Sequence, residues 1–225
     1  MSRKPEAHRR LAAQLTPLPE LAGAGSRRVI LDAALRLFAE RGYGGASVRD
    51  LAALSGLQPA SLYAHFPSKE HVLAELCRLG HEEFVRGLRA ALLDCGPDPR
   101  HQVAAYMRAH VSFHAEYSML AVICNSELHM LSAPMAAPSL ALRKQGEDLL
   151  TSIIRRGQEH ALFDVPHVWL SAAMVGGAGL RVANWYTPEF ELGADEVGQV
   201  YARFAWRILG VAEDWERPRR ARRAK

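Results

Sequence analysis

The sequence predicts an all-α fold of about nine helices, with a three-helix head followed by a larger helical bundle. Apolar residues recur with a helical period through most of the 225 residues, and no alternating strand pattern competes with it. Serine, glycine and proline stand where helices should begin and end. A hydrophobic fraction of 49% indicates a globular chain with ample material for a core.

The first helix is predicted to follow Ser26, which is a favourable N-cap residue. The apolar residues after it have the i, i+3, i+4, i+7, i+8 spacing of an amphipathic helix: Val29, Ile30, Ala33, Ala34, Leu37 and Phe38. Gly42 is expected to end this helix in the left-handed conformation that glycine adopts easily.

Two short helices complete the head. Ser47 caps the first of them, whose apolar face comprises Val48, Leu51, Ala52 and Leu54. Gly56 supplies the turn, and residues 58–66 form the next helix, with Leu62 and Phe66 facing inward. Two short helices joined by a glycine-containing turn are the layout of a helix-turn-helix motif, whose second helix lies in the DNA major groove.

The remaining helices form the body of the protein. Pro67 stops the head, and Ser68 caps a long helix that reaches about Leu93. Further helices are expected near residues 100–117, 119–132, 138–161, 165–186 and 194–213. Breaks are expected at residues 132–138, 163–166 and 187–193.

Composition narrows the class of protein. Three cysteines without paired spacing (Cys77, Cys95 and Cys124) indicate reduced thiols in a cytoplasmic protein, with no zinc motif. The longest apolar run, near residues 168–180, is too short to span a bilayer, and no secretory signal is visible. We therefore expect no membrane partner.

The net charge of +4 is unevenly distributed. Residues 1–25 and 26–80 each carry +2, residues 216–225 carry +5, and the middle of the chain carries −5. A basic head and basic ends with an acidic body suit a protein that contacts DNA at one end. For the C-terminal run of arginines alone, a solvated tail is an equally good interpretation.

The head carries several independent sequence motifs. These are LFAERGY at 37–43, LAALSGL at 51–57 and YAHFPSKE at 63–70. Together they resemble the TetR family of one-component transcriptional repressors over about residues 26–75. The resemblance implies four segments: a flexible basic arm (1–25), a helix-turn-helix domain (26–72), a helical ligand-binding and dimerisation domain (73–213) and a basic tail (214–225).

The DNA contacts expected from this layout are of two kinds. Gln58 and Ser61, near the start of the recognition helix, are placed to read base edges, together with the intervening Pro59 and Ala60. The other residues are expected to contact the phosphate backbone: Ser47 and Val48 through helix N-terminal N–H groups, and Arg49, Tyr63, His65 and Lys69 through their side chains. A partly packed Tyr63 remains the structural alternative.

The segment from Gln58 to Ala60 departs from the family pattern. Family members often have a small residue, then Lys or Arg, then Gly at these positions. Pro59 is compatible with a first helical turn, but it removes a basic contact there. The operator sequence therefore cannot be inferred from relatives.

In the TetR family the last two long helices usually pair with those of a second copy. The corresponding segments are 165–186, with several small residues, and 194–213, with a broad apolar stripe. That stripe could also pack within its own domain. A homodimer is favoured because paired operator half-sites require a two-fold symmetric protein.

The body also resembles TetR regulators that respond to acyl-CoA thioesters, through residues 125–128, 155–157 and 185–188. In that subgroup an Arg and a Trp one turn apart contact the ligand, as Arg181 and Trp185 could. A structural arginine stacked on a core tryptophan is an equal alternative. The other ligand-binding candidates are Arg108, His114, Cys124 and Met130.

No metal or other cofactor is predicted. His110 and His114 share a helix face, but two ligands alone make a poor metal site. No Gly-rich phosphate loop, HExxH, GxSxG or paired-carboxylate motif indicates an enzyme.

The favoured function is a repressor of a palindromic double-stranded DNA operator, released by a small hydrophobic or acyl-CoA-type effector. Release would follow from a change in the spacing of the two heads. One alternative is a helical-bundle binding protein or enzyme with an incidental helix-turn-helix. Another is a ligand-blind nucleoid or scaffold protein, which the sizeable acidic body disfavours.

Overall fold

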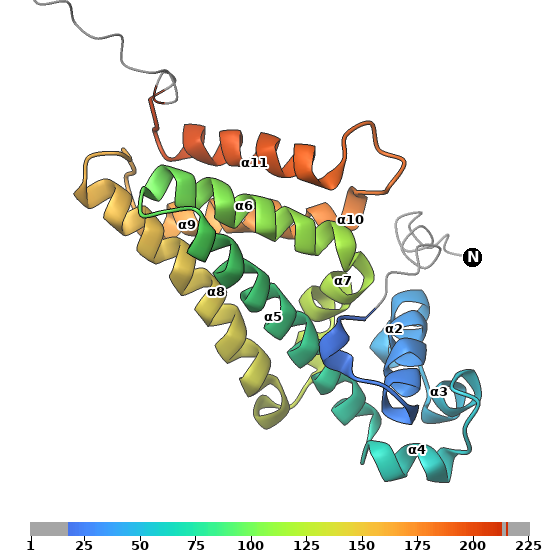
Figure 1. The fold of residues 1–225 in the computed structure, drawn as a ribbon. Coiled ribbons are helices and arrows are strands. Elements are labelled where there is room, and N and C mark those ends of the chain that lie inside the picture. Colours follow the sequence, from blue (N-terminus) through green and yellow to red (C-terminus); the bar gives the residue numbers. More distant parts are fainter. Residues whose placement is uncertain (1–17, 213–214, 216–225) are drawn as a thin grey trace, which may run out of the picture.

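The computed structural model describes residues 18–212 and Trp215, and every regular element in this part of the chain is helical (Figure 1). The head comprises α2 (Ser26–Gly45), α3 (Val48–Leu54) and α4 (Pro59–His65). The body comprises α5 (Lys69–Asp94), α6 (Pro99–Glu116), α7 (Ser118–Ser126), α8 (Ala133–Glu159), α9 (Val168–Leu180), α10 (Val182–Trp185) and α11 (Ala194–Ile208). Two 3-10 helices complete the element order: η1 (Glu20–Ala22) precedes α2, and η2 (Leu128–Met130) lies between α7 and α8.

The core of the head continues into the body. Phe38 of α2, Leu51 of α3 and Leu62 of α4 are fully buried in a cluster that also contains Leu73 of α5 and Leu120 of α7. Predicted inward residues Leu62 and Phe66 are thus confirmed as core. Because apolar burial is the main stabilising term, α5 and α7 are part of the support that holds the head.

The body is a bundle in which α5 packs along α8, and α6 lies between α5 and α11 (Figure 1). Its core includes Leu88 of α5, Met107 of α6, Ile154 of α8 and Val175 of α9. The inner face of α11, which includes Ala202 and Ala205, packs on α6 and contributes to the same core. Much of the apolar stripe of α11 therefore faces its own domain.

Helix boundaries differ from the prediction in the head. The N-cap of α2 is Gly25 rather than Ser26. Gly42 does interrupt α2, with φ 70° and ψ 164°, a conformation almost restricted to glycine, but one more helical turn follows to Gly45. The caps Ser47 and Ser68 are confirmed, since each accepts a hydrogen bond from the first turn of its helix.

The larger differences lie in the body. The helix predicted at 119–132 ends at Ser126, and η2 follows it. The predicted break at 132–138 is wrong: α8 begins at Ala133 and contains Pro138 in its second turn, where proline removes only one helical hydrogen bond. The helix predicted at 165–186 is divided at Arg181 into α9 and α10. The last helix ends at Ile208 rather than 213.

The predicted flexible arm (1–25) and basic tail (214–225) lie mostly outside the described residues. Where the arm is described, it differs from the prediction: Leu18 and Ala22 are buried, and the Arg28 guanidinium donates to the carbonyls of Leu18, Pro19 and Gly23. Trp215 packs edge-on against Trp206 at 4.8 Å between ring centroids.

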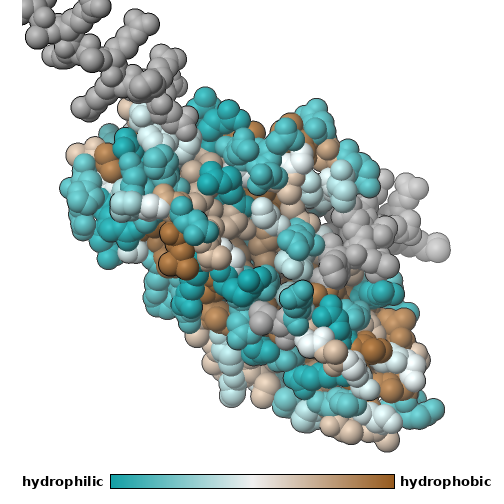
Figure 2. Space-filling model, in the orientation of Figure 1, coloured by the Kyte–Doolittle hydropathy of each residue, from teal (hydrophilic) through white to brown (hydrophobic). Residues whose placement is uncertain are grey.

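The face of the molecule in Figure 2 is mostly hydrophilic, with small apolar groups, several of them over the head near α2 and α3. None of the helices in the described residues is long and apolar enough to cross a membrane. The exposed apolar residues that bear on function lie on α4, on α9 and at the α10 end of the bundle.

Candidate functional site

The second helix of the helix-turn-helix, α4, presents most of its surface to solvent. Gln58 is its N-cap, and Pro59 is its first residue, where a missing N–H costs nothing. Leu62 is the only buried residue within the helix. The exposed residues include all those predicted to contact DNA from this segment: Gln58, Pro59, Ala60, Ser61, Tyr63 and His65.

The N-terminus of α3 is closed by a capping box. The Ser47 hydroxyl accepts from the Asp50 N–H, and the Asp50 carboxylate accepts from both the N–H and the hydroxyl of Ser47. These hydrogen bonds, with Arg41 nearby, lower the pKa of Asp50. The prediction of a free Ser47 N–H for phosphate is therefore wrong; the capping box leaves the N–H groups of Val48 and Arg49 unused.

Lys69 holds the head together rather than projecting as a free charge. Its ammonium donates to the carbonyls of Tyr43 (2.8 Å) and Ala46 (2.7 Å) and lies 4.1 Å from the centre of the Tyr43 ring. Burial lowers the pKa of Lys69. Two of its three N–H donors are thus used inside the protein, which leaves one for the predicted phosphate contact.

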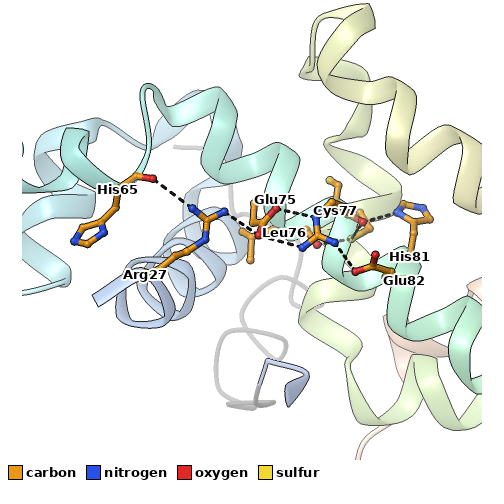
Figure 3. A network of polar contacts seen from close by, with 9 residues as sticks. Arg27, His65, Glu75, Leu76, Cys77, His81 and Glu82 are labelled. Atoms are coloured by element: carbon orange, nitrogen blue, oxygen red, sulfur yellow. Dashed lines mark hydrogen bonds and ion pairs between the residues drawn. The ribbon is translucent and has the colours of Figure 1, made fainter. Parts of the chain in front are cut away.

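Arg27 links the end of the recognition helix to the body, as Figure 3 shows. Its guanidinium donates to the His65 carbonyl (3.4 Å), pairs with the Glu75 carboxylate (2.9 Å) and lies over the Phe66 ring (4.3 Å). Arg78 donates to the same Glu75 carboxylate. Arg27 could not be predicted from the sequence, because its partners lie 38 and 48 residues away and no local spacing indicates them.

The first turn of α5 also connects the head to α8. Glu70, next to Lys69, accepts from the backbone N–H of Ser132 at 2.7 Å, and Ser132 is the N-cap of α8. This hydrogen bond lowers the pKa of Glu70. Adjacent residues of α5 therefore hold the α2–α3 connection on one side and the start of α8 on the other.

Two clefts flank this junction. One of about 240 Å³ lies between α2 and α7, with Arg41 and Glu127 among its lining residues. The other, of about 270 Å³, lies between the end of α4, α5 and the start of α8. The head is therefore attached through a few polar contacts and a shared core, with open space on both sides.

Inside the body, a small cavity of about 40 Å³ lies where α5, α6, α7, α8 and α9 converge. Its apolar walls include Phe84, Phe113, Ala121 and Leu180. Its polar lining comprises His81, His114, Cys124, Asn125 and Arg143. Two of the predicted ligand-binding residues, His114 and Cys124, are thus brought together here.

Burial sets the charge state of this lining. It lowers the pKa of both His81 and His114 to about 4, so both imidazoles are neutral at pH 7. The neighbouring Cys77 thiol and burial raise the pKa of Cys124. Among the described residues, no set of three or more His, Cys, Asp or Glu side chains is placed to hold a metal ion.

The structure separates the other ligand-binding candidates from the cavity. Arg108 packs against Gly198 of α11, and Met130 lies exposed in η2, so neither residue lines the cavity. Arg181 and Trp185 do not face into it either. Both are exposed on the surface, and the Trp185 ring packs against Phe190 at 5.2 Å. Arg181 directly follows Leu180, which lines the cavity.

Comparison with known proteins decides the family. The family model described as "Bacterial regulatory proteins, tetR family" matches residues 30–76, and "Tetracyclin repressor-like, C-terminal domain" matches residues 96–209, about half of the chain. The chain belongs to the TetR family. It is a ligand-responsive transcriptional repressor with a helix-turn-helix head, and not an enzyme.

Among TetR-family relatives, the HTH-type transcriptional repressor KstR2 of Rhodococcus jostii is 28% identical over 193 residues, 83% of this chain and 94% of its own length. The crystal structure of PfmR from Thermus thermophilus is 33% identical, with a TM-score of 0.72, and the match covers 82% of this chain and 98% of PfmR. AibR, solved in complex with isovaleryl coenzyme A and operator DNA, shares the fold with a TM-score of 0.73 at 23% identity, over 84% and 100% of the two chains.

Proposed function

We propose that the protein binds a palindromic operator as a homodimer and inserts α4 into the major groove. Gln58 and Ser61 would read base edges, while Arg49, Tyr63 and His65 would contact phosphates. The observation that carries this proposal is the outward face of α4, on which Tyr63 and the other side chains of this segment are exposed while Leu62 and Phe66 anchor the helix from behind. Arg49 is exposed on the neighbouring helix α3. Most of these contacts position the protein, and few of them carry sequence information.

A stripe on α9 is the proposed dimer surface. Its apolar residues follow helical spacing: exposed Trp169 and Ala173 and half-buried Gly177 form one row, and exposed Leu170, Met174 and Ala178 form the next. Exposed apolar groups of this extent are typical of an interface with another protein. The small residues would allow a second copy of α9 to approach closely, and exposed Phe204 of α11 would extend the contact.

The proposed effector is an acyl-CoA thioester. AibR, which shares the fold, is known in complex with isovaleryl coenzyme A. In this chain Leu180 lines the small cavity, and exposed Arg181 and Trp185 follow it on the surface. The acyl group would therefore enter past Leu180, while Arg181 would pair with the phosphates of the coenzyme and Trp185 would offer a stacking surface.

Release from DNA would act through α5. This helix lines the cavity with His81 and also carries Lys69, Glu70 and Glu75, which hold the head and the start of α8. An effector that separates α5 from α7 and α8 would move these anchors, and the clefts beside the head leave it room to rotate. A differential affinity of ~1–3 kcal/mol between the two states is the usual scale of such coupling.

Fluorescence anisotropy with an operator duplex and added acyl-CoA tests both parts of the proposal. We expect tight operator binding that a short acyl-CoA releases, and Arg181→Ala should raise the concentration needed for release by about tenfold or more. Arg89→Ala, at an exposed arginine of α5 that does not line the cavity, is the matched control and should leave release unchanged. If Arg181→Ala behaves like the control, the proposed role of Arg181 is wrong.

A further inference from the structure

Three buried histidines lie together at the inner end of the bundle. His81 of α5 and His114 of α6 line the cavity, and His110, one turn before His114, stacks on it with 4.6 Å between ring centroids. All three are nearly inaccessible to solvent. Imidazoles are seldom buried in such a group, because each has two polar ring atoms that need partners.

The hydrogen bonds of two rings fix their tautomers. Nδ1 of His81 lies 2.7 Å from the Cys77 carbonyl, as Figure 3 shows, and Nδ1 of His114 lies 2.8 Å from the His110 carbonyl. A carbonyl only accepts, so Nδ1 carries the proton in both rings. In the neutral form this leaves Nε2 of His81 and His114 as hydrogen-bond acceptors on rings that line the cavity.

The third ring is unsatisfied on both sides. Within the described residues, neither Nδ1 nor Nε2 of His110 has a hydrogen-bond partner, although the ring is fully buried. Gly179 of α9 closes over it, and a Cβ at Gly179 would lie within 2.9 Å of the ring. A neutral imidazole has one donor and one acceptor, so among the residues that the structure describes His110 keeps both without a partner, directly behind His114.

The donors and acceptors that line the cavity favour a group that can both donate and accept a hydrogen bond. The Nε2 atoms of His81 and His114 require a donor, whereas Arg143 and the Asn125 amide supply N–H groups. A hydroxyl donates one hydrogen bond and accepts others, so it matches this set, whereas a keto oxygen only accepts. A carboxylate could pair with Arg143 but would leave both Nε2 acceptors facing its lone pairs, and these acceptors stay unprotonated at neutral pH.

We propose that the effector carries a hydroxyl group on its acyl chain and that the imidazoles of His81 and His114 recognise it, with His110 packed behind His114. This inference rests on the proposed acyl-CoA effector and specifies its class. The cavity of about 40 Å³, which is partly open to the surface, has room for a hydroxyl with one or two carbons, and the ring walls of Phe84 and Phe113 suit the adjoining methylene groups. A short chain with its hydroxyl near the end fits best.

Isothermal titration calorimetry of the full-length protein with butanoyl-CoA and 3-hydroxybutanoyl-CoA tests the proposal. The two ligands differ by one oxygen. We expect the hydroxylated thioester to bind at least about tenfold more tightly, because a site with buried polar groups discriminates strongly against a ligand that leaves them unpaired. Equal affinities would overturn the proposal while leaving an acyl-CoA effector in place; no binding of either thioester would overturn both.

Single-residue variants test whether the histidine cluster produces the preference for the hydroxylated thioester. His114→Phe should bind both thioesters equally, and His101→Phe, an exposed position on the same helix, should keep the tenfold preference. Operator binding by each variant reports that the protein is folded. A preference that survives in folded His114→Phe would contradict recognition by this cluster. If His114→Phe does not bind operator, His81→Phe replaces it with the same expectation.

Discussion

Arg27 illustrates how a single side chain can position a recognition helix without touching DNA. It holds the last carbonyl of α4 and the carboxylate of Glu75 with one guanidinium. Because the side chain is about half exposed, the ion pair itself should contribute only about 0.5 kcal/mol to stability. We therefore expect its main effect to be on the orientation of α4, the helix proposed to enter the major groove.

We predict that Arg27→Met weakens operator binding by roughly fivefold, while the unfolding free energy changes by less than about 1 kcal/mol. Arg36→Met is the matched control, since Arg36 is an exposed arginine on the same helix and the substitution removes the same charge. Anisotropy titrations at one salt concentration compare the two. Equal losses would mean that Arg27 contributes only its charge.

His81 makes stability depend on pH. Burial lowers its pKa to about 4, whereas an unfolded histidine titrates near 6.5. Between these values the unfolded chain binds the proton and the folded protein does not, so this contribution is complete above about pH 6.5 and is lost as pH falls towards 4. By pH 5 roughly 2 kcal/mol of this contribution has been lost.

Accordingly, His81→Phe should lose about 2 kcal/mol less unfolding free energy than the wild type between pH 7.5 and pH 5. Urea denaturation at the two pH values gives this difference directly. Parallel losses in the two proteins would show that His81 can be protonated in the folded state.

At the scale of helices, α5 is the connecting element. Lys69, in its first turn, fixes the segment between α2 and α3 through two backbone carbonyls. We predict that Lys69→Met lowers the unfolding free energy by about 1 kcal/mol and weakens operator binding about tenfold or more, because α3 loses its support. Effector binding in the body should be unchanged.

Lys144→Met on α8 controls for the lost charge, as Lys144 forms only an exposed pair with Asp148. Thermal unfolding and operator titration of both variants provide the comparison. If Lys69→Met binds operator as tightly as Lys144→Met, the hydrogen bonds of Lys69 to the Tyr43 and Ala46 carbonyls are not required for DNA binding by the head.

Helices could be predicted where local signals determine them. Residue type at a single position determines the N-caps at Ser47 and Ser68 and the interruption at Gly42, and all three positions were predicted correctly. Pro138 misled the prediction, because a proline in the second turn of a helix looks like a break. The division of α9 from α10 at Arg181 has no proline to mark it, and it depends on packing between helices.

The candidate functional residues also fall into those that a local pattern predicts and those that depend on contacts between distant parts of the chain. The exposed face of α4 could be predicted because a helix-turn-helix determines which side is outward. Arg27, the second role of Lys69 and the His81 wall of the cavity depend on contacts between residues far apart in the chain. Arg108 and Met130 were predicted from their chemistry alone, and in the fold Arg108 packs against α11 while Met130 is exposed in η2, both outside the cavity lining.

For the whole molecule, dimerisation and DNA binding should be inseparable. Met174 is 64% exposed in the centre of the α9 stripe. Met174→Glu would place two like charges at the proposed two-fold interface, so we predict a monomer and a loss of operator affinity of about a hundredfold or more.

Light scattering after size exclusion gives the mass, and anisotropy gives the affinity. Leu93→Glu, at an exposed site at the end of α5, is the control and should remain dimeric. If the Met174→Glu protein stays dimeric, the α9 stripe is not the dimer interface.

DNase I footprinting of DNA upstream of the protein's own gene tests the central claim most directly. We predict one protected segment with two inverted half-sites about one or two helical turns apart, lost with Gln58→Ala and Ser61→Ala combined. Added short hydroxyacyl-CoA should remove the protection. Absence of any site-specific protection by the wild-type dimer, on this DNA and on a selected random pool, would contradict the assignment of α4 as a sequence-reading helix.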